Sequence, residues 1–251
     1  MKPIIIHLAG NVPKSGGNTG IMLEKLNGKL QLVLASKSGG RAKVLRDAGF
    51  VFDVVPSDVD ESAIRDLHLG MQSLKILSFY SRLLNFLKVQ NSKNFHDRNP
   101  ESLVKKLALA KAEYVAAKLY AKNIVIGADT VCVFGGKIIE KPRDLEEAAA
   151  MLGAFSGKTH MILTGIAVVN KESKKSLVDV SVSTVTFRKI REAEIGDYLK
   201  SGDALRFAGG YNIDSTKSMR FIEGISGSYT GTIGMPLEKL IPMLKKCGVD
   251  A

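Results

Sequence analysis

The chain reads Leu30-Gln-Leu-Val-Leu-Ala-Ser-Lys-Ser-Gly-Gly-Arg41 at the point where its apolar pattern first becomes regular. The apolar run 30–35 predicts a short buried strand, and the serines and glycines of 36–40 predict a turn. Residues 41–49 then show apolar positions at helical spacing and end in Gly49, which is a C-terminal stop signal. A strand, a glycine-containing turn and a helix in this order are typical of an α/β fold.

The same alternation continues along the 251 residues. We predict further strands at 50–55, 124–128, 131–134, 167–169 and 178–187, and helices at 101–121, 145–152 and 192–199. The helix at 101–121 carries an apolar stripe with Lys111 at its edge. The pattern predicts a single layered α/β domain, and no internal repeat is visible.

Basic residues exceed acidic ones, with 36 Lys and Arg against 25 Asp and Glu, which gives a net charge of +11. This excess suits phosphates, nucleic acid or an anionic membrane surface. More than half of it lies in two stretches, 1–29 and 66–99. We expect 1–29 to be an irregular leader, and 67–99 to be an insertion with a basic amphipathic helix. The partner of that helix is left open between a membrane, another protein and its own domain.

Only two cysteines, Cys132 and Cys247, are present, so no disulfide framework or metal-binding cysteine pair is expected. The apolar run at the start is too short for a signal peptide, and no segment reaches the length needed to span a bilayer. The four histidines lack the paired spacing of a zinc site. These observations predict a cytoplasmic protein without a transmembrane segment.

Polar residues gather where the predicted strands end, which is where open α/β sheets bind ligands. Ser36, Ser38 and Arg41 follow the first strand, and the glycine turn offers N–H groups at a helix N-terminus, so this segment is either a phosphate cradle or an ordinary structural turn. Asp129 ends the apolar run 124–128, where it either terminates the strand or serves as a functional carboxylate.

A second loop carries carboxylates at Asp58, Asp60 and Glu61. This loop and Asp129 together could hold Mg²⁺ through one or two direct ligands and several waters, although a solvated acidic turn is the simpler reading of each. Lys141-Pro142 places a cation on a rigid turn.

Further motifs follow in a fixed order after Leu34-Ala-Ser-Lys-Ser-Gly-Gly-Arg41: Phe52-Asp-Val-Val-Pro-Ser-Asp-Val-Asp-Glu61, Leu107-Ala-Leu-Ala-Lys-Ala112, Ile126-Gly-Ala-Asp-Thr130, Lys141-Pro142, Met151-Leu152, Ser156-Gly-Lys-Thr-His160, Thr164-Gly165, Ala208-Gly-Gly-Tyr211, Gly227-Ser-Tyr229 and Gly234-Met-Pro-Leu237. From about Leu30 to Cys247 the chain resembles the Maf family of nucleoside triphosphate pyrophosphatases. The resemblance implies a domain at 30–251, interrupted by the insertion, with an elongated twisted mixed sheet flanked by helices. Its two lobes would enclose a nucleotide cleft, as in the inosine triphosphate pyrophosphatase fold.

The resemblance also implies a reaction, in which water attacks the α-phosphorus of a nucleoside triphosphate with the help of Mg²⁺ or Mn²⁺. The match assigns the chemistry to Asp129 as general base with Glu61 and Lys111, and the metal to Glu61 and Asp129. It assigns substrate binding to Ser36, Ser38, Arg41, Lys141, Thr130 and Asp214. A homodimer is implied as well, whereas no nucleic-acid partner is expected.

Some departures from the family pattern bear on substrate recognition. Gly40 has no side chain where the family has Arg or Trp, Asp214 replaces the amide of Tyr-Gly-Ile-Gln, and Phe207 replaces a Lys. An ionised carboxylate only accepts hydrogen bonds, so a uracil or thymine edge would be read differently. The preferred base therefore stays open between dTTP or UTP and modified nucleotides. The alternative function is a nucleotide-binding regulator of cell division with little hydrolysis.

Overall fold

The computed structural model describes residues 31–68, 99–119 and 122–249, whose strands form one seven-stranded sheet. The strands are β1 (Gln31–Leu34), β2 (Asp53–Val54), β3 (Asn123–Phe134), β4 (Lys137–Ile139), β5 (Thr159–Asn170), β6 (Lys175–Phe187) and β7 (Ile222–Ser226). Their order is β2-β1-β3-β5-β6-β7, with β4 beside β3. β1 pairs in parallel with β2 and β3, and the other pairs are antiparallel. The predicted mixed sheet is confirmed.

β3 is a single strand of 12 residues, so the expectation that Asp129 ends a shorter strand is wrong. Its ladder with β5 runs unbroken from Ile124 to Val133, and Asp129 lies opposite Gly165. Asp129 is a polar residue within an apolar strand that continues on both sides of it, and its side chain lines a cavity.

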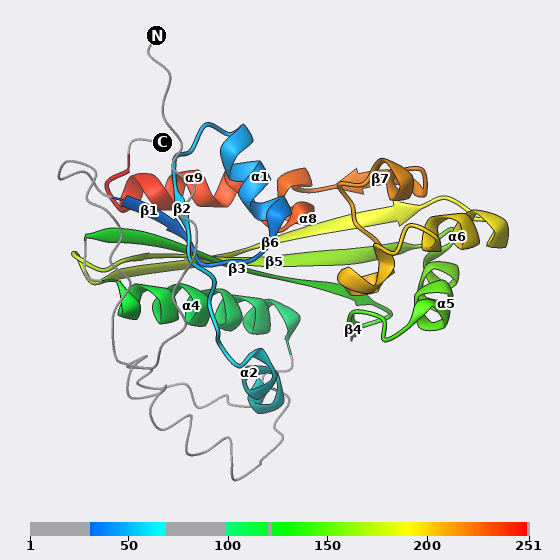
Figure 1. Ribbon diagram of the computed structural model, residues 1–251, viewed down its shortest axis with the longest axis horizontal. Helices are drawn as coiled ribbons and strands as arrows, with labels where there is room; N and C mark the ends of the chain where they lie inside the picture. The colour runs from blue at the N-terminus through cyan, green and yellow to red at the C-terminus, as the bar shows by residue number, and fades with distance from the viewer. Residues whose placement is uncertain (1–30, 69–98, 120–121, 250–251) are drawn as a thin grey trace.

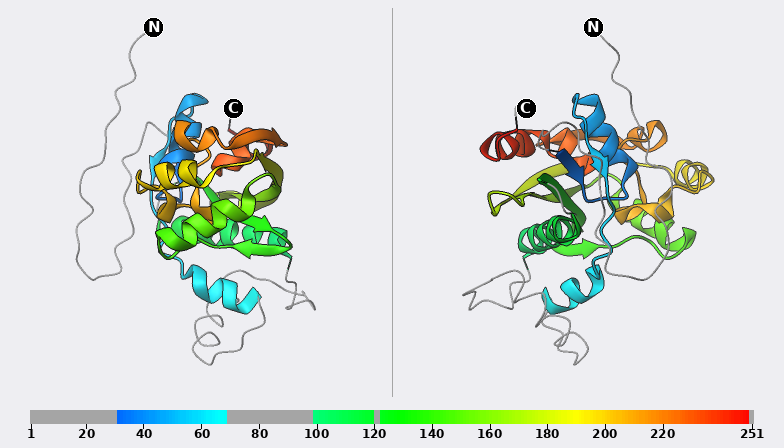
Figure 2. Two further views of the ribbon diagram at one scale, coloured as in Figure 1. Left: turned by 90° about the vertical axis from the view of Figure 1, so that its right-hand side faces the viewer. Right: turned by 60° about the vertical axis from the view of Figure 1, so that its left-hand side comes forward.

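The helices cover both faces of the sheet (Figures 1 and 2). α4 (Pro100–Lys118) lies along one face, and α2 (Glu61–His68) packs beside it. α1 (Gly39–Asp47) and α9 (Leu237–Lys246) cover the opposite face, together with the short α8 (Tyr229–Ile233). The apolar sides of these helices are buried on the sheet, which confirms the predicted layered α/β domain.

α4 approaches the sheet closely because two glycines lie beneath it. A Cβ atom on Gly127 would come within 2.1 Å of the Ala108 carbonyl oxygen, and one on Gly165 within 2.2 Å of the Val104 carbonyl oxygen. The helix therefore packs backbone against backbone, which brings the Lys111 side chain within reach of β3.

A second hydrophobic core lies at the other end of the sheet, where α5 (Leu145–Phe155) and α6 (Glu192–Leu199) pack with the short helices η1 (Ala204–Arg206), η2 (Ala208–Gly210) and α7 (Thr216–Met219) nearby (Figure 1). β3 and β5 contribute to both cores: Ile126 and Ile166 to the first, Cys132 and Ile162 to the second. The two lobes thus share their strands.

Several predicted elements have different limits. The strand expected at 50–55 is only β2 (Asp53–Val54), the helix expected at 101–121 ends at Lys118, and the strand expected at 167–169 is part of the longer β5. The predicted leader at 1–29, and most of the insertion at 67–99 with its basic helix, lie outside the described residues.

Among the described helices, none has the length and apolar character needed to cross a membrane.

Candidate active site

A cavity of about 1080 Å³ opens beside β3, at a place where one edge of this strand has no strand partner. β1 pairs with β3 only as far as Ile126, and β4 begins its pairing at Cys132. In the part of the chain that the structure describes, the edge between these two residues is therefore open. Asp129 and Thr130 lie in this gap, and their side chains point to opposite faces of the sheet.

The structure brings all nine residues predicted for the site to this one cavity: Ser36, Ser38, Arg41, Glu61, Lys111, Asp129, Thr130, Lys141 and Asp214. A volume of this size is ample for a nucleotide-sized ligand. Asp60 does not line the cavity, because its carboxylate accepts hydrogen bonds from Ser62 and the Ala63 N–H at the start of α2. Glu61 is the first residue of α2, and does not lie in a loop as expected.

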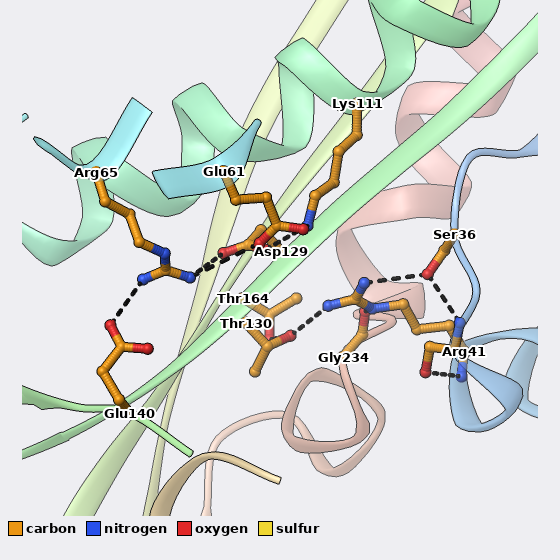
Figure 3. A network of polar contacts seen from close by, with 11 residues as sticks. Ser36, Arg41, Glu61, Arg65, Lys111, Asp129, Thr130, Glu140, Thr164 and Gly234 are labelled. Carbon is orange, nitrogen blue, oxygen red and sulfur yellow. Dashed lines mark hydrogen bonds and ion pairs between the residues drawn. The ribbon is translucent and has the colours of Figure 1, made fainter. Parts of the chain in front are cut away.

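An ion-pair network with the buried Lys111–Asp129 pair at its centre joins three of these residues across the α4 face (Figure 3). The Lys111 Nζ lies 2.6 Å from Asp129 Oδ1 and 2.9 Å from Glu61 Oε1. Lys111 and Asp129 are 6% and 4% exposed, so water screens their attraction weakly. Burial alone would raise the pKa of Glu61, but the charge and hydrogen bond of Lys111, with Arg65 and Arg41, hold that pKa below its usual range.

Arg65 belongs to the same network, although the sequence analysis did not single it out. Its guanidinium lies near Asp129, Glu61 and Glu140 (Figure 3). The signal that could have found it is the spacing of four residues from Glu61, which places the two side chains on one side of a helix. That signal was hidden because residues 58–61 were interpreted as a loop.

Arg41 organises the opposite face of the gap. Its Nη1 donates to Ser36 Oγ, its Nη2 to Thr130 Oγ1, and its Nε to the Gly234 carbonyl oxygen. Burial lowers the pKa of Arg41, and the charges of Asp129 and Glu61 oppose that shift. Gly234 has a φ of +101° and no space for a Cβ atom, which would lie 2.9 Å from both Arg41 Nε and Thr130 Oγ1.

Gly39 and Gly40 are the first two residues of α1, so the turn before this helix is formed by residues 35–38, and the expectation that the glycines form the turn is wrong. Ser38 is the N-cap of α1, and its Oγ accepts a hydrogen bond from the Arg41 N–H. Ser36 Oγ accepts from the Ser38 N–H as well as from the Arg41 side chain. The turn is thus stabilised by its own serines, and it also forms part of the cavity wall.

Aromatic side chains of the second core support the far wall of the cavity. The Tyr211 hydroxyl lies 2.6 Å from His160 Nε2, and the His160 ring stacks on Phe155 with centroids 4.4 Å apart. Burial raises the pKa of the Cys132 thiol to about 12, which disfavours the nucleophilic thiolate form of this cavity residue. Asp214 follows on the same wall, where its backbone N–H donates to Asn212 Oδ1.

His160 should make the folded state sensitive to acid. Burial lowers its pKa from 6.5 to about 4. Between these two pH values the His160 imidazole is protonated in the unfolded chain and neutral in the folded chain. Stability is therefore lost as the pH falls from 6.5 towards 4, by up to about 3 kcal/mol. The glutamine of His160→Gln does not titrate in this range. We therefore expect the difference in unfolding free energy between the wild type and this variant, measured by urea unfolding, to shrink as the pH falls from 6.5 towards 4.

Glu113 acts in the opposite sense, because burial raises its pKa to about 7 and the folded state then gains stability as the pH falls. The wild type and the His160→Gln variant both contain Glu113, so its contribution cancels in the difference between their unfolding free energies. A stability gap that stays constant from pH 7 to 4.5 would contradict the assignment to His160.

The carboxylates of Asp129 and Glu61 fit a divalent cation that prefers oxygen ligands. Asp129 Oδ2 is buried and has no hydrogen-bond partner, whereas Oδ1 is bound by Lys111. Within the described ranges, His, Cys, Asp and Glu form no cluster of three or more suited to a metal ion. Two carboxylates match Mg²⁺, which is usually bound through one or two carboxylates, with waters and substrate phosphates completing the shell.

Comparisons with known proteins give consistent results. The family model described as Maf-like protein matches residues 31–247. A dTTP/UTP pyrophosphatase of Pelotomaculum thermopropionicum is 34% identical over 220 residues, which cover 88% of this chain and 98% of the relative. A second dTTP/UTP pyrophosphatase, from Symbiobacterium thermophilum, is 34% identical over 218 residues, covering 87% of this chain and 94% of the relative.

Among solved structures, a nucleoside-triphosphatase / dITP/XTP pyrophosphatase of Mycobacterium abscessus matches 86% of this chain and 97% of its own, with 12% identity and a TM-score of 0.34.

Proposed function

The chain belongs to the Maf family, and from this premise we propose that it hydrolyses nucleoside triphosphates to the monophosphate and pyrophosphate. The observation that carries the proposal is the Asp129 carboxylate, which is buried at the open edge of β3 and fixed by Lys111 beside a nucleotide-sized cavity. The curated relatives named above act, by their names, on dTTP and UTP, which makes pyrimidine triphosphates the first substrates to test.

Asp129 is the proposed general base. It accepts the proton of a water molecule whose oxygen attacks the α-phosphorus, while the bond from that phosphorus to the bridging oxygen breaks and pyrophosphate leaves. Lys111 holds the Asp129 carboxylate in place through the 2.6 Å contact. The cavity cations Lys141 and Arg41, together with Ser36, Ser38 and the wall that contains Thr130, are proposed to contact the substrate.

A Mg²⁺ or Mn²⁺ ion is part of the proposal. Glu61 and Asp129 would hold it, since both carboxylates line the cavity and the free Asp129 Oδ2 offers a ligand. When bound, such an ion stabilises negative charge on the phosphates and lowers the pKa of a coordinated water.

The base pocket is proposed to lie along the wall formed by 211–214. Asp214 offers only acceptors to a base. A Cβ atom added at Gly40 would lie 3.3 Å from the Ile233 side chain, so a larger residue at this part of the cavity would require Ile233 to shift. With Gly40 and Asp214 at this wall, the proposed substrates are dTTP or UTP or, alternatively, modified nucleotides.

The test is a panel of common and modified nucleoside triphosphates, incubated with the full chain and Mg²⁺ or Mn²⁺, with released pyrophosphate as the readout. We expect release from at least one pyrimidine or modified triphosphate, and none after chelation of the metal. If no triphosphate yields pyrophosphate, the enzymatic proposal fails. Tight nucleotide binding without product would favour the regulatory alternative, which is motivated by the changes at Gly40 and Asp214.

We also propose a cytoplasmic location, which the two cysteines support. Cys132 and Cys247 are both buried and free of disulfides, as expected in a reducing compartment. Homodimerisation, implied by the family resemblance, stays a prediction that light scattering of the purified chain would check.

A further inference from the structure

Arg65 lies in the candidate site but has no role in the mechanism proposed so far. It is on α2, one helical turn after Glu61, and its side chain is 22% exposed where it lines the cavity. Figure 3 shows the side chain reaching from α2 towards Asp129, with Glu140 on its other side.

The contacts of Arg65 with its three carboxylates are loose. Its Nη2 lies 3.8 Å from Asp129 Oδ2 and 3.9 Å from Glu61 Oε2, which is beyond hydrogen-bonding distance. The single hydrogen bond found for the guanidinium is from Nη1 to Glu140 Oε1 at 3.3 Å, and Glu140 is largely exposed. Coulomb attraction therefore holds Arg65 near the site while most of its N–H donors stay without acceptors among the described residues.

Two other cations of the cavity, Arg41 and Lys111, are engaged more tightly. Arg41 uses all three side-chain nitrogens to bind oxygens of the protein. Lys111 lies within 2.9 Å of both Asp129 and Glu61. A polyphosphate that enters the cavity can therefore accept hydrogen bonds from Arg65, because this side chain still has N–H donors without acceptors among the described residues. The fork of a guanidinium also matches two phosphate oxygens.

We propose that Arg65 binds the polyphosphate part of the substrate and exchanges its loose carboxylate contacts for hydrogen bonds to phosphate oxygens. This inference rests on the proposed function and adds a substrate-binding residue to it. The carboxylates of Asp129 and Glu61 are thereby released from Arg65 but remain bound to Lys111.

The test is calorimetric binding of inorganic pyrophosphate and, separately, of thymidine monophosphate to the full chain in the presence of Mg²⁺. We expect Arg65→Gln to weaken pyrophosphate binding by about tenfold or more, and Arg65→Lys to fall between, because lysine keeps the charge but loses the fork. Binding of the monophosphate should change by less than about twofold. The matched control is Arg191→Gln, which removes an 83% exposed guanidinium that is not among the cavity residues.

Glu140→Gln separates phosphate binding from a structural role. If Arg65 acts only by attaching α2 to Glu140, this variant should weaken pyrophosphate binding as Arg65→Gln does, and that result would overturn the proposal. Unchanged pyrophosphate affinity in Arg65→Gln, or an equal loss for both ligands, would overturn it as well. Because these are binding measurements, they are independent of pyrophosphate release by the wild type, which alone decides the proposed function.

Discussion

Asp129→Asn should lower the rate of pyrophosphate release by about 10²–10⁴-fold, since a general base of this kind contributes that much and an amide cannot take the proton from water. The substitution preserves the shape of the side chain. It also removes the negative charge that the Lys111 ammonium contacts at 2.6 Å. If the amide oxygen stays towards Lys111, the amide N–H groups face the Arg65 guanidinium, and the carboxylate oxygen proposed as a metal ligand is lost.

The measurement is the initial rate of pyrophosphate release at saturating substrate, for the wild type and the variant side by side. Asp197→Asn is the control, because it removes a carboxylate of α6 that is 75% exposed and whose ion pair with Lys200 lies at the protein surface. Thermal unfolding of both variants tests whether the fold is kept, because loss of one partner of a buried pair also destabilises a protein. A folded Asp129→Asn protein within about tenfold of the wild-type rate would refute the assigned role.

Gly165→Ala should be among the most damaging small substitutions in the described part of the sheet. The new Cβ atom would lie 2.2 Å from the carbonyl oxygen and 2.4 Å from the carbonyl carbon of Val104, and backbone atoms cannot rotate away as a side chain does. α4 must then move off the sheet. We expect a loss of about 3 kcal/mol or more, at the upper end of what overpacking costs, with a fall in activity because α4 carries Lys111.

Urea unfolding measures this effect as a lower midpoint with an unchanged slope. Gly196→Ala is the matched control, because Gly196 lies inside α6 and a Cβ atom there meets no atom within 4 Å. Alanine at that position should stabilise the protein by about 0.5–1 kcal/mol. Equal midpoints for Gly165→Ala and the wild type would show that α4 adapts without cost.

The sequence predicts the layers of this fold well, because their signals are local. The helical stripe around Leu107 corresponds to α4, and the apolar run 30–35 contains β1. The position of Asp129 within its strand was mistaken, since a polar residue in an apolar run resembles a strand end when its partner Lys111 on α4 is unknown. Only the ladder with β5, in which the partner of Asp129 is Gly165, shows that the strand continues.

Site residues within the ordered motifs could likewise be named from the sequence, and all of them reach one cavity. Arg65 and the His160 pair with Tyr211 could not be deduced. The role of Arg65 depends on where α2 begins, and the pairing of His160 depends on the packing of a core assembled from distant segments. The sequence pattern alone therefore does not indicate either contact.

The hydrogen bond between Arg41 and the Gly234 carbonyl joins residues separated by 193 positions. The core beneath the cavity is equally non-local, because Leu34 and Ile126 pack with Met235 and Leu244. Contacts of such long sequence separation slow folding, as their loops must close before the contacts stabilise the chain. During synthesis, nearly the whole polypeptide must therefore leave the ribosome before the cavity can form, so a truncated chain that lacks its last twenty residues has the carboxylates but no completed site.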